Sequence, residues 1–231
     1  MASPVIEGTA DSNSSTSSTS FTVNLPTGIV SGEGILVAVT RDGGAGTVSF
    51  PAGYTKLYDL IDDDLFAAGA AAWKQSTGGE PASITVTSST SDPFVARAWR
   101  ISGATDFTVT PPDFGTVVNA GNTTTHDPPN VSVTGGSNDI LIIPILHFDT
   151  YTASVSSFPS GYVNTGSAAS GTAGSQCEMA WCDLSTTAAS ANPGAYTLST
   201  TRRAVTSTII FQASGGAPAV TNVNLPLLGV S

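Results

Sequence analysis

Positively charged residues are scarce in this sequence. Only seven of its 231 residues are Lys or Arg, against 17 Asp or Glu, which gives a formal net charge of −10. A protein that binds a nucleic-acid backbone needs clustered Lys and Arg to neutralise phosphates, so we expect no nucleic-acid partner. The one adjacent basic pair, Arg202 and Arg203, is interpreted as a solvated strand end.

Charged residues of both signs make up only 10% of the chain, whereas 40% is hydrophobic. Disorder is favoured by the opposite balance, high charge with low hydrophobicity, so the chain is expected to fold. The sequence has 24 Gly and abundant Ser and Thr in place of charges. Uncharged polar residues on exposed strand faces, joined by Gly-rich turns, are typical of a β-sandwich.

Cysteine and histidine are also rare. Cys177 and Cys182 are five residues apart, which places them on opposite faces of a strand and makes a mutual disulfide improbable. A zinc site would need two further ligands, so both are interpreted as buried thiols. His147 precedes Asp149 by two residues and could join a metal site or a proton relay, but a hydrogen-bonded histidine at a strand end is favoured. His126 is expected to be solvated.

Long apolar runs are absent. No stretch approaches the roughly 20 residues that a membrane-spanning helix requires, so no membrane partner is expected. The first eleven residues carry neither the basic nor the apolar segment of a secretory signal. We therefore expect synthesis in a cytoplasm without export by the common route.

Sequence motifs of enzymes are absent as well. The chain has no Gly-x-Ser-x-Gly elbow, no phosphate-binding loop and no Cys–His arrangement. The densest acidic group, Asp59 with Asp62, Asp63 and Asp64, is interpreted as a solvated turn, with a calcium loop as the alternative. Glycoside hydrolysis would need two carboxylates facing each other across a cleft, which a sequence cannot display. We expect no enzyme activity, no catalytic or metal-binding residue and no cofactor.

What the sequence does contain is a long internal repeat. The spacing from Phe50 to Phe158 is 108 residues, and so is the spacing from Trp73 to Trp181. The matched segments are Ile35–Val39 with Ile140–Pro144, Ser49–Tyr54 with Ser157–Tyr162, and Ala71–Trp73 with Met179–Trp181. Because the two Trp residues occupy equivalent positions, a repeated role in the core is expected for them.

The repeat predicts an all-β fold of two duplicated antiparallel β-sandwich units, jelly-roll-like in character. The predicted divisions are an extended N-terminal arm at 1–20, repeat 1 at 21–103, a linker at 104–130, repeat 2 at 131–215 and an apolar tail at 216–231. Two similar sandwiches in close contact are favoured, and one larger body is the alternative.

The central strand of each copy, at 35–40 and 140–148, is apolar without alternation, which predicts burial on both faces. Pro144 lies inside the second of these strands. Since proline has no N–H for the ladder, a bulge or a sheet edge is expected there. The segment 165–175 contains almost only Gly, Ser, Ala and Thr and is expected to be a loop.

Two sets of residues are candidates for binding. An uncharged apolar tail is an aggregation hazard in water unless it packs on something, so its apolar residues are candidates for docking on a partner; a final strand folded back on its own sandwich is the alternative. These tail residues are Val220, Val223, Leu225, Leu227 and Leu228. Trp99 has no aromatic counterpart in the second copy, where Ile209 is taken as its equivalent, and it is the candidate for an exposed, ligand-facing side chain.

The strand pattern resembles that of β-rich structural proteins of tailed bacteriophages, which decorate or cement capsids or belong to tail fibres. The resemblance rests on Gly34–Val39, Phe50–Leu57, Gly79–Pro81 and Ala98–Gly103. It departs from that pattern at Gly34, where Asp is expected, and at Tyr54, where Trp is expected; Asp139 restores the Asp in the second copy.

The resemblance implies a virion protein assembled in the host cytoplasm. Its first implied role is decoration of the head, bound to the major capsid protein and to copies of itself, with a homotrimer as the first expectation. The alternative role is a tail-fibre or receptor-binding module that recognises host glycan, and a glycan hydrolase on a fibre is a third. The resemblance carries over no catalytic residue.

Overall fold

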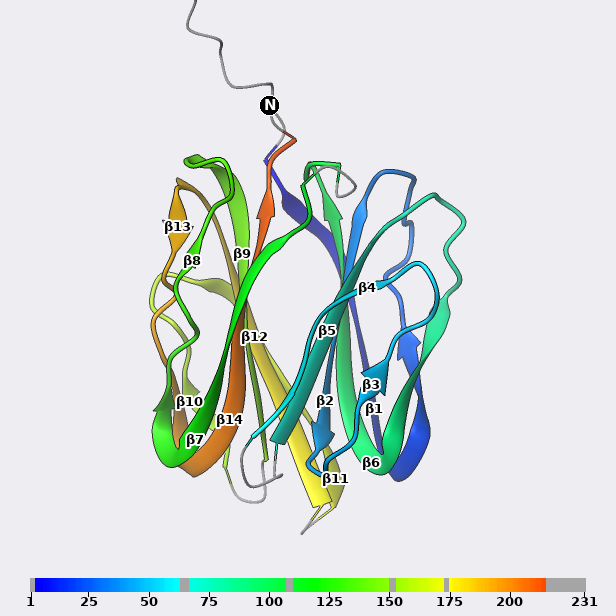
Figure 1. Cartoon of the computed structure of the whole chain (residues 1–231), viewed down its shortest axis with the longest axis vertical. Coiled ribbons are helices and arrows are strands. Elements are labelled where there is room, and N and C mark those ends of the chain that lie inside the picture. The colour runs from blue at the N-terminus through cyan, green and yellow to red at the C-terminus, as the bar shows by residue number, and fades with distance from the viewer. Residues whose placement is uncertain (1–2, 63–66, 107–109, 150–152, 173–174, 215–231) are drawn as a thin grey trace, which may run out of the picture.

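The protein consists of strands and their connections throughout the part that its computed structural model describes, residues 3–62, 67–106, 110–149, 153–172 and 175–214 (Figure 1). The strands are β1 (Val5–Asn24), β2 (Gly34–Asp42), β3 (Val48–Ser49), β4 (Thr55–Ile61), β5 (Ala67–Gln75), β6 (Ser83–Ser102), β7 (Asp113–His126), β8 (Val131–Ser132), β9 (Asn138–Asp149), β10 (Val155–Ser157), β11 (Val163–Thr172), β12 (Ser175–Ala188), β13 (Ser190–Ala191) and β14 (Tyr196–Gln212).

Each repeat builds one six-stranded antiparallel sheet, and the two sheets have the same strand order. The first sheet runs β1-β6-β2-β5-β4, with β3 on β6. The second runs β7-β14-β9-β12-β11, with β10 on β14. The short pair β8 and β13 lies beside the second sheet. The predicted duplication and the all-β antiparallel fold are confirmed. Of the two arrangements expected, the structure has one larger body, in which each repeat contributes one sheet.

The strand registers show that residues 108 positions apart occupy equivalent places in the two sheets. In the first sheet, Leu36 pairs with Trp73 on one side and Trp99 on the other. The matching row of the second sheet is Trp181, Ile145 and Ser207. Trp73 and Trp181 therefore do occupy equivalent positions. The counterpart of Trp99 is Ser207 and not Ile209, as the sequence comparison had it, so Trp99 still has no aromatic counterpart.

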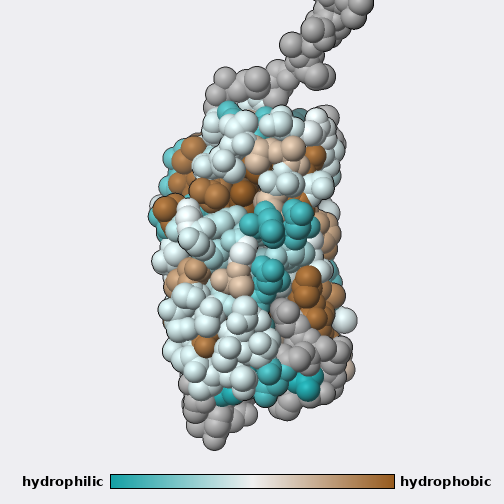
Figure 2. Space-filling model, turned by 90° about the vertical axis from the view of Figure 1, so that its left-hand side faces the viewer, coloured by the Kyte–Doolittle hydropathy of each residue, from teal (hydrophilic) through white to brown (hydrophobic). Residues whose placement is uncertain are grey.

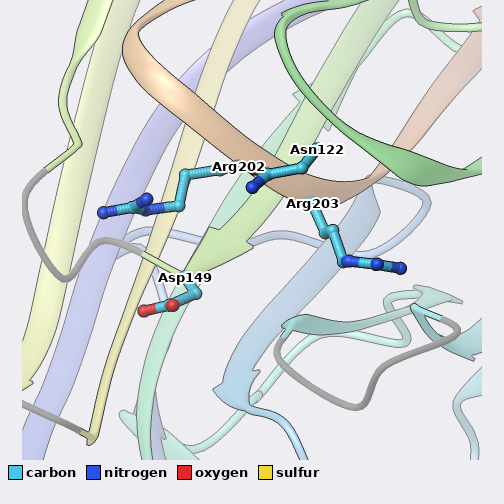
Figure 3. A pocket seen from close by; sticks show the side chains of 4 residues that line it. All are labelled: Asn122, Asp149, Arg202 and Arg203. Atoms are coloured by element: carbon cyan, nitrogen blue, oxygen red, sulfur yellow. The ribbon is translucent and has the colours of Figure 1, made fainter.

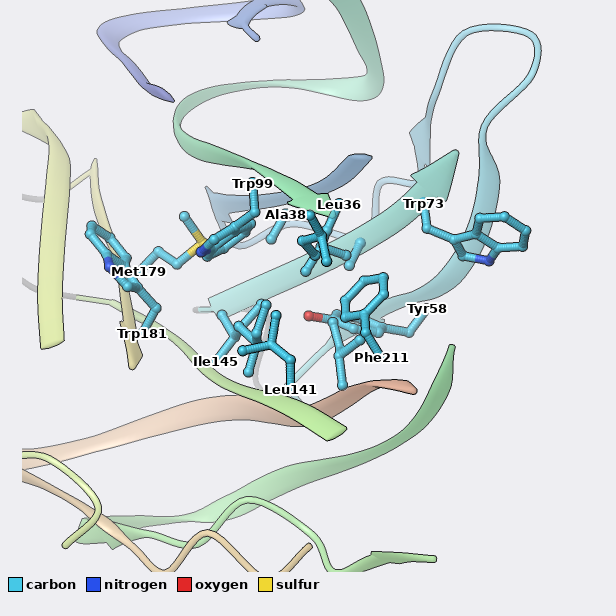
Figure 4. Close-up of a cluster of buried hydrophobic side chains, with 14 of the residues drawn as sticks. Leu36, Ala38, Tyr58, Trp73, Trp99, Leu141, Ile145, Met179, Trp181 and Phe211 are labelled. Atoms are coloured by element: carbon cyan, nitrogen blue, oxygen red, sulfur yellow. The ribbon is translucent and has the colours of Figure 1, made fainter. Parts of the chain in front are cut away.

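The two sheets face each other and share one apolar core (Figure 4). The core is made of Leu36, Ala38, Tyr58, Ala71, Trp73, Val95, Trp99, Ile101, Leu141, Ile143, Ile145, Cys177, Met179, Trp181, Ile209 and Phe211. Fully burying a large apolar side chain contributes about 1.5–3 kcal/mol, so this core ties the repeats together. Trp73 and Trp181 are both in it, as their repeated positions predicted.

The outer face of each sheet is covered by its own repeat. Strands β1 and β6 are 20 residues each and turn back over β2 at the lower right of Figure 1. Phe21 and Val23 of β1, with Val86 of β6, thereby reach the face that carries Val37 and Val39 of β2. The second repeat repeats this arrangement around β9. The central strands β2 and β9 are thus buried on both faces, as predicted.

The predicted divisions of the chain were wrong at two places. Residues 5–20 are not a separate arm, because they form most of β1 and pair along β6. Part of the predicted linker at 104–130 is strand β7, which pairs with β14. Both strands pair with one neighbour only and are rich in Ser, Thr and Asn, so they lack the apolar alternation that identifies a strand. The repeats therefore begin at Val5 and Asp113.

Two local expectations in the second repeat were also wrong. Pro144 lies in a central strand without a bulge, since the ladder between β9 and β12 keeps one register from Ile145–Trp181 to Ile142–Leu184. Its carbonyl accepts a hydrogen bond from the Tyr196 hydroxyl at 2.8 Å. Most of the expected loop at 165–175 is the strand β11.

The surface is mainly uncharged and polar. Figure 2 shows the side of the second repeat that lies at the left of Figure 1, where hydrophobic residues form separate areas on a pale, weakly polar background. The large apolar side chains that are most exposed come from four different places: Val5, Val30, Phe114 and Val163. Among the residues that the structure describes, none forms a helix long and apolar enough for a membrane span.

Candidate functional site

The histidine that sequence reasoning singled out lies between the two sheets. His147 of β9 is fully buried, and its Nδ1 is 2.6 Å from the Thr40 Oγ1 while its Nε2 is 2.9 Å from the Tyr58 hydroxyl. The same hydroxyl is 2.9 Å from the Ser207 Oγ. Burial lowers the pKa of His147 to about 3, so the ring is neutral at pH 7. The interpretation as a hydrogen-bonded histidine is confirmed.

The remaining histidine and the cysteines are buried as well. His126 was expected to be solvated, but it lies in β7 with no exposed surface, and this burial lowers the pKa of its ring. Cys177 and Cys182 are buried free thiols, as predicted. The pKa of the Cys182 thiol is raised to about 12, mainly because burial disfavours the thiolate.

The aspartates at 59 and 62 form hydrogen bonds to nearby residues of their own repeat. The Asp62 carboxylate is buried and accepts a hydrogen bond from the Ala67 N–H at 2.7 Å. Asp59 accepts hydrogen bonds from the Val48 N–H and the Lys56 ammonium group. Asp63 and Asp64 lie outside the described residues. Among the residues that the structure describes, no group of three His, Cys, Asp or Glu side chains is placed to hold a metal ion.

A pocket opens where one edge of the first sheet meets one edge of the second. Edge strands β1 and β11 lie side by side there, and the Asn13 side-chain amide donates to the Ala169 carbonyl at 3.4 Å. The cavity has a volume of about 280 Å³. Its lining is Ile6, Glu7, Gly8 and Thr9 of β1, Arg97 and Trp99 of β6, Asn164 of β11, and Trp181 and Asp183 of β12. We call it the seam pocket.

Arg97 is held in place in the wall of the seam pocket. Its Nη1 donates to Asp11 Oδ1 at 2.5 Å, and its Nη2 donates to the Thr9 hydroxyl at 2.9 Å. Its guanidinium carbon lies 4.1 Å from the centre of the Trp181 ring and 5.5 Å from that of Trp99. Asp11 and Arg97 are direct partners in the ladder between β1 and β6, so the sheet register brings this ion pair together.

Two acidic side chains line the same pocket. Asp183 is nearly buried and accepts a hydrogen bond from the Asn164 amide at 3.1 Å. Burial raises the pKa of Asp183, while the Asn164 hydrogen bond and the charge of Arg97 act in the opposite direction. Glu7 accepts a hydrogen bond from the Ser102 hydroxyl at 2.6 Å and lies at an irregularity of the β1–β6 ladder. Irregularities of this kind re-aim side chains next to binding sites.

Trp99 lines the seam pocket, but it is only 1% exposed. The expected exposed indole is therefore not present, because Trp99 also packs in the core between the sheets. A contact of Trp99 with a ligand remains a prediction. The tail residues Val220, Val223, Leu225, Leu227 and Leu228 lie outside the described residues, so their docking role also stays a prediction.

A second, smaller pocket of about 190 Å³ lies on the second repeat (Figure 3). It is lined by Asn122, Asp149, Arg202 and Arg203. The two arginines point in opposite directions from β14. They are half-buried within this strand, at an irregularity of its pairing with β7, and not at a solvated strand end. Among the residues that the structure describes, the pocket gathers Asp149 with both cations but no aromatic side chain.

Sequence reasoning missed Arg97, Asn164 and Asp183. The internal repeat contained a signal for two of them. At the 108-residue spacing, Arg97 corresponds to Val205 and Asp183 corresponds to Gln75, so the residue type differs between the two copies. A comparison of the copies for their differences, and not only for their shared residues, would have found these positions. The strand partners that place them in one pocket could not be found in this way.

Comparison of the chain with protein-family models, with curated proteins and with solved structures finds no match. The functional argument therefore rests on the geometry of this chain and on the resemblance of its strand pattern.

Proposed function

We propose that this protein is a structural component of a tailed-phage particle that decorates the head and strengthens it by binding across subunit boundaries of the shell. The observation that carries the structural role is the shared core, which joins two six-stranded sheets into one body. A body of this kind transmits load between the surfaces it contacts. The placement in a virion is supported by the resemblance of the strand pattern.

The test is the copy number of the chain in purified particles of its source virus, measured by quantitative mass spectrometry against the main shell protein. We expect a number comparable to that of the shell protein. Adding the purified protein to undecorated shells is expected to raise the temperature at which they break open. A copy number many-fold lower would place the protein in the tail or a fibre, and absence from particles would contradict a virion role.

The apolar tail is the predicted contact to the shell or to other copies. Deleting residues 217–231 is expected to abolish shell binding and to reduce the oligomer to a monomer, while the melting temperature of the monomer stays the same. Light scattering and shell co-sedimentation measure the first two effects. An unchanged oligomer and unchanged binding would contradict the docking role, and a lower melting temperature would indicate a strand folded back on its own sandwich.

A second candidate function is recognition of host glycan by a tail-fibre or receptor-binding module. The seam pocket favours it, because aromatic walls, carboxylates and an amide in one small cavity are the groups that bind polar neutral ligands. In this case the protein would be present at low copy number and would bind to the host surface.

A further inference from the structure

The two sheets meet along two equivalent seams, and the residues of the seam pocket are found at one of them only. Edge strands β1 and β11 meet at this pocket, and the equivalent strands β7 and β4 meet on the opposite side of the molecule. Tryptophan occupies both equivalent positions of β12 and β5, Trp181 and Trp73. The remaining sheet positions differ: Arg97, Trp99 and Asp183 correspond to Val205, Ser207 and Gln75.

This difference distinguishes the pocket residues from residues that the fold itself requires. Groups that the two-sheet fold requires would recur at both seams, as the paired Trp residues do. Among the described residues, a partly buried arginine between two Trp rings, with a nearly buried carboxylate beside it, occurs at one seam only. The two-sheet fold therefore does not require the arginine and the carboxylate at both seams, which leaves them available for a ligand.

The pocket is also fixed before any ligand arrives. The guanidinium of Arg97 is held by Asp11, Thr9 and the face of Trp181. Asn164 has a φ of 48°, the one positive value at a non-glycine residue in the described part of the chain. Asn adopts this region more readily than other non-glycine residues, and here it lies at an irregularity of the β11–β12 ladder, which holds its side chain toward Asp183. Groups that are held in place lose little entropy on binding.

The charges of the pocket restrict the class of ligand. Glu7 and Asp183 line the pocket, and Arg97 is already paired with Asp11, so an anionic ligand would be repelled. A cationic ligand would have to lie beside the guanidinium of Arg97, which already pairs with Asp11. A neutral ligand rich in hydroxyl groups meets neither obstacle, because hydroxyls donate to the carboxylates and both donate to and accept from the Asn164 amide.

The size and walls of the cavity agree with a small sugar. Ligand pockets commonly measure about 300–1,000 Å³, and a cavity of about 280 Å³ lies at the lower end of this range, which restricts the ligand to a small molecule. Trp99 and Trp181 line the cavity, but Trp99 is 1% exposed and the Arg97 guanidinium covers the Trp181 ring, so a sugar would be held mainly by hydrogen bonds. Thr9 adds a hydroxyl at the rim.

From this geometry we infer that the seam pocket binds a neutral saccharide unit, with Asp183 and Asn164 as the residues that hydrogen-bond its hydroxyls. The biological role of this binding rests on the second candidate function, whereas the binding itself does not. Binding is a property of the isolated protein, whereas the place in the particle is decided by copy number, so either proposal can fail without the other.

The experiment is saturation-transfer NMR on the purified full chain with glucose, galactose, mannose, N-acetylglucosamine and the disaccharides of these sugars as probes. The sugar that gives a signal is then titrated against three variants. Asp183→Asn removes the charge and keeps the shape. Asn164→Gly removes the amide and keeps the backbone, because glycine adopts a positive φ freely. Asp127→Asn is the control, with the same charge change at an exposed side chain.

We expect the wild type and Asp127→Asn to bind one of these sugars equally, and Asp183→Asn and Asn164→Gly to bind it about tenfold more weakly or worse. Binding of no sugar by the wild type would overturn the inference, as would equal binding by all variants. Preferential binding of ethylammonium chloride, included as a cationic probe, would overturn it in favour of an amine ligand. Cleavage of a bound disaccharide would support the site and contradict a non-enzymatic function.

Discussion

We expect Gly69→Ala to lower the free energy of unfolding by roughly 3–5 kcal/mol, which is a large share of the stability of an ordinary domain. A Cβ at Gly69 of β5 would lie 2.4 Å from the Cγ and Cδ2 atoms of the buried His147 ring. The ring would have to move, and it would lose its contacts with Thr40 and Tyr58. The expected loss combines about 1–3 kcal/mol for overpacking with about 1–3 kcal/mol for each buried polar group left without a partner.

Chemical denaturation of the wild type and the variant measures this effect. The matched control is Gly8→Ala, another glycine-to-alanine change within a strand, where the nearest atom to the new Cβ would be 3.5 Å away. The control is expected to change stability by less than about 1 kcal/mol. Equal effects of the two substitutions would show that the contact between β5 and His147 does not constrain the packing of the repeats.

His147 is expected to make the protein sensitive to acid. Its pKa is about 3 in the folded protein because of burial, against about 6.5 in the unfolded chain. The unfolded chain therefore binds the proton first as the pH falls. The contribution of neutral His147 to stability is complete above pH 6.5 and decreases as the pH falls toward 3. With a slope of at most about 1.4 kcal/mol per pH unit, the loss between pH 6.5 and 4 is roughly 3 kcal/mol.

The measurement is the free energy of unfolding of the wild type and of His147→Gln at several pH values between 7 and 4. The variant is expected to be less stable at pH 7 and to lose less stability in acid, so that the two curves converge. Tyr58, the titratable partner of His147, has a raised pKa and stays neutral over this range. The buried carboxyls of Glu178 and Asp183 also titrate, but they are common to both proteins and cancel in the difference. Parallel curves would contradict the assignment.

The sequence predicted the parts of the fold that a repeated apolar pattern encodes. The 108-residue spacing of Trp73 and Trp181 predicted equivalent core positions, and the sheet registers confirm it. The apolar segments at 35–40 and 140–148 were recognised as strands buried on both faces. Both predictions depend on a sufficient number of apolar residues in a regular order.

The missed features depend on contacts between distant segments. Strands β1 and β7 contain mostly Ser, Thr, Asn and Gly in the regions that were assigned to an arm and a linker, and they are held by pairing with β6 and β14. The seam pocket combines Arg97 with Trp181 and Asp183 from the other repeat. No local pattern reveals that these residues meet, because the meeting is decided by how the two sheets face each other.

The reciprocal contacts of the two repeats have a consequence for the history of the chain. A protein with a single repeat would expose the apolar inner face of its sheet, and a second copy would cover it with the same contacts, β1 on β11 and β7 on β4. Symmetric dimers are built from self-complementary faces of this kind. The present chain has the architecture of such a homodimer joined end to end. In a homodimer, any substitution at one seam would also be present at the other seam. In the joined chain, the positions of Arg97, Trp99 and Asp183 can be substituted without a change at the other seam.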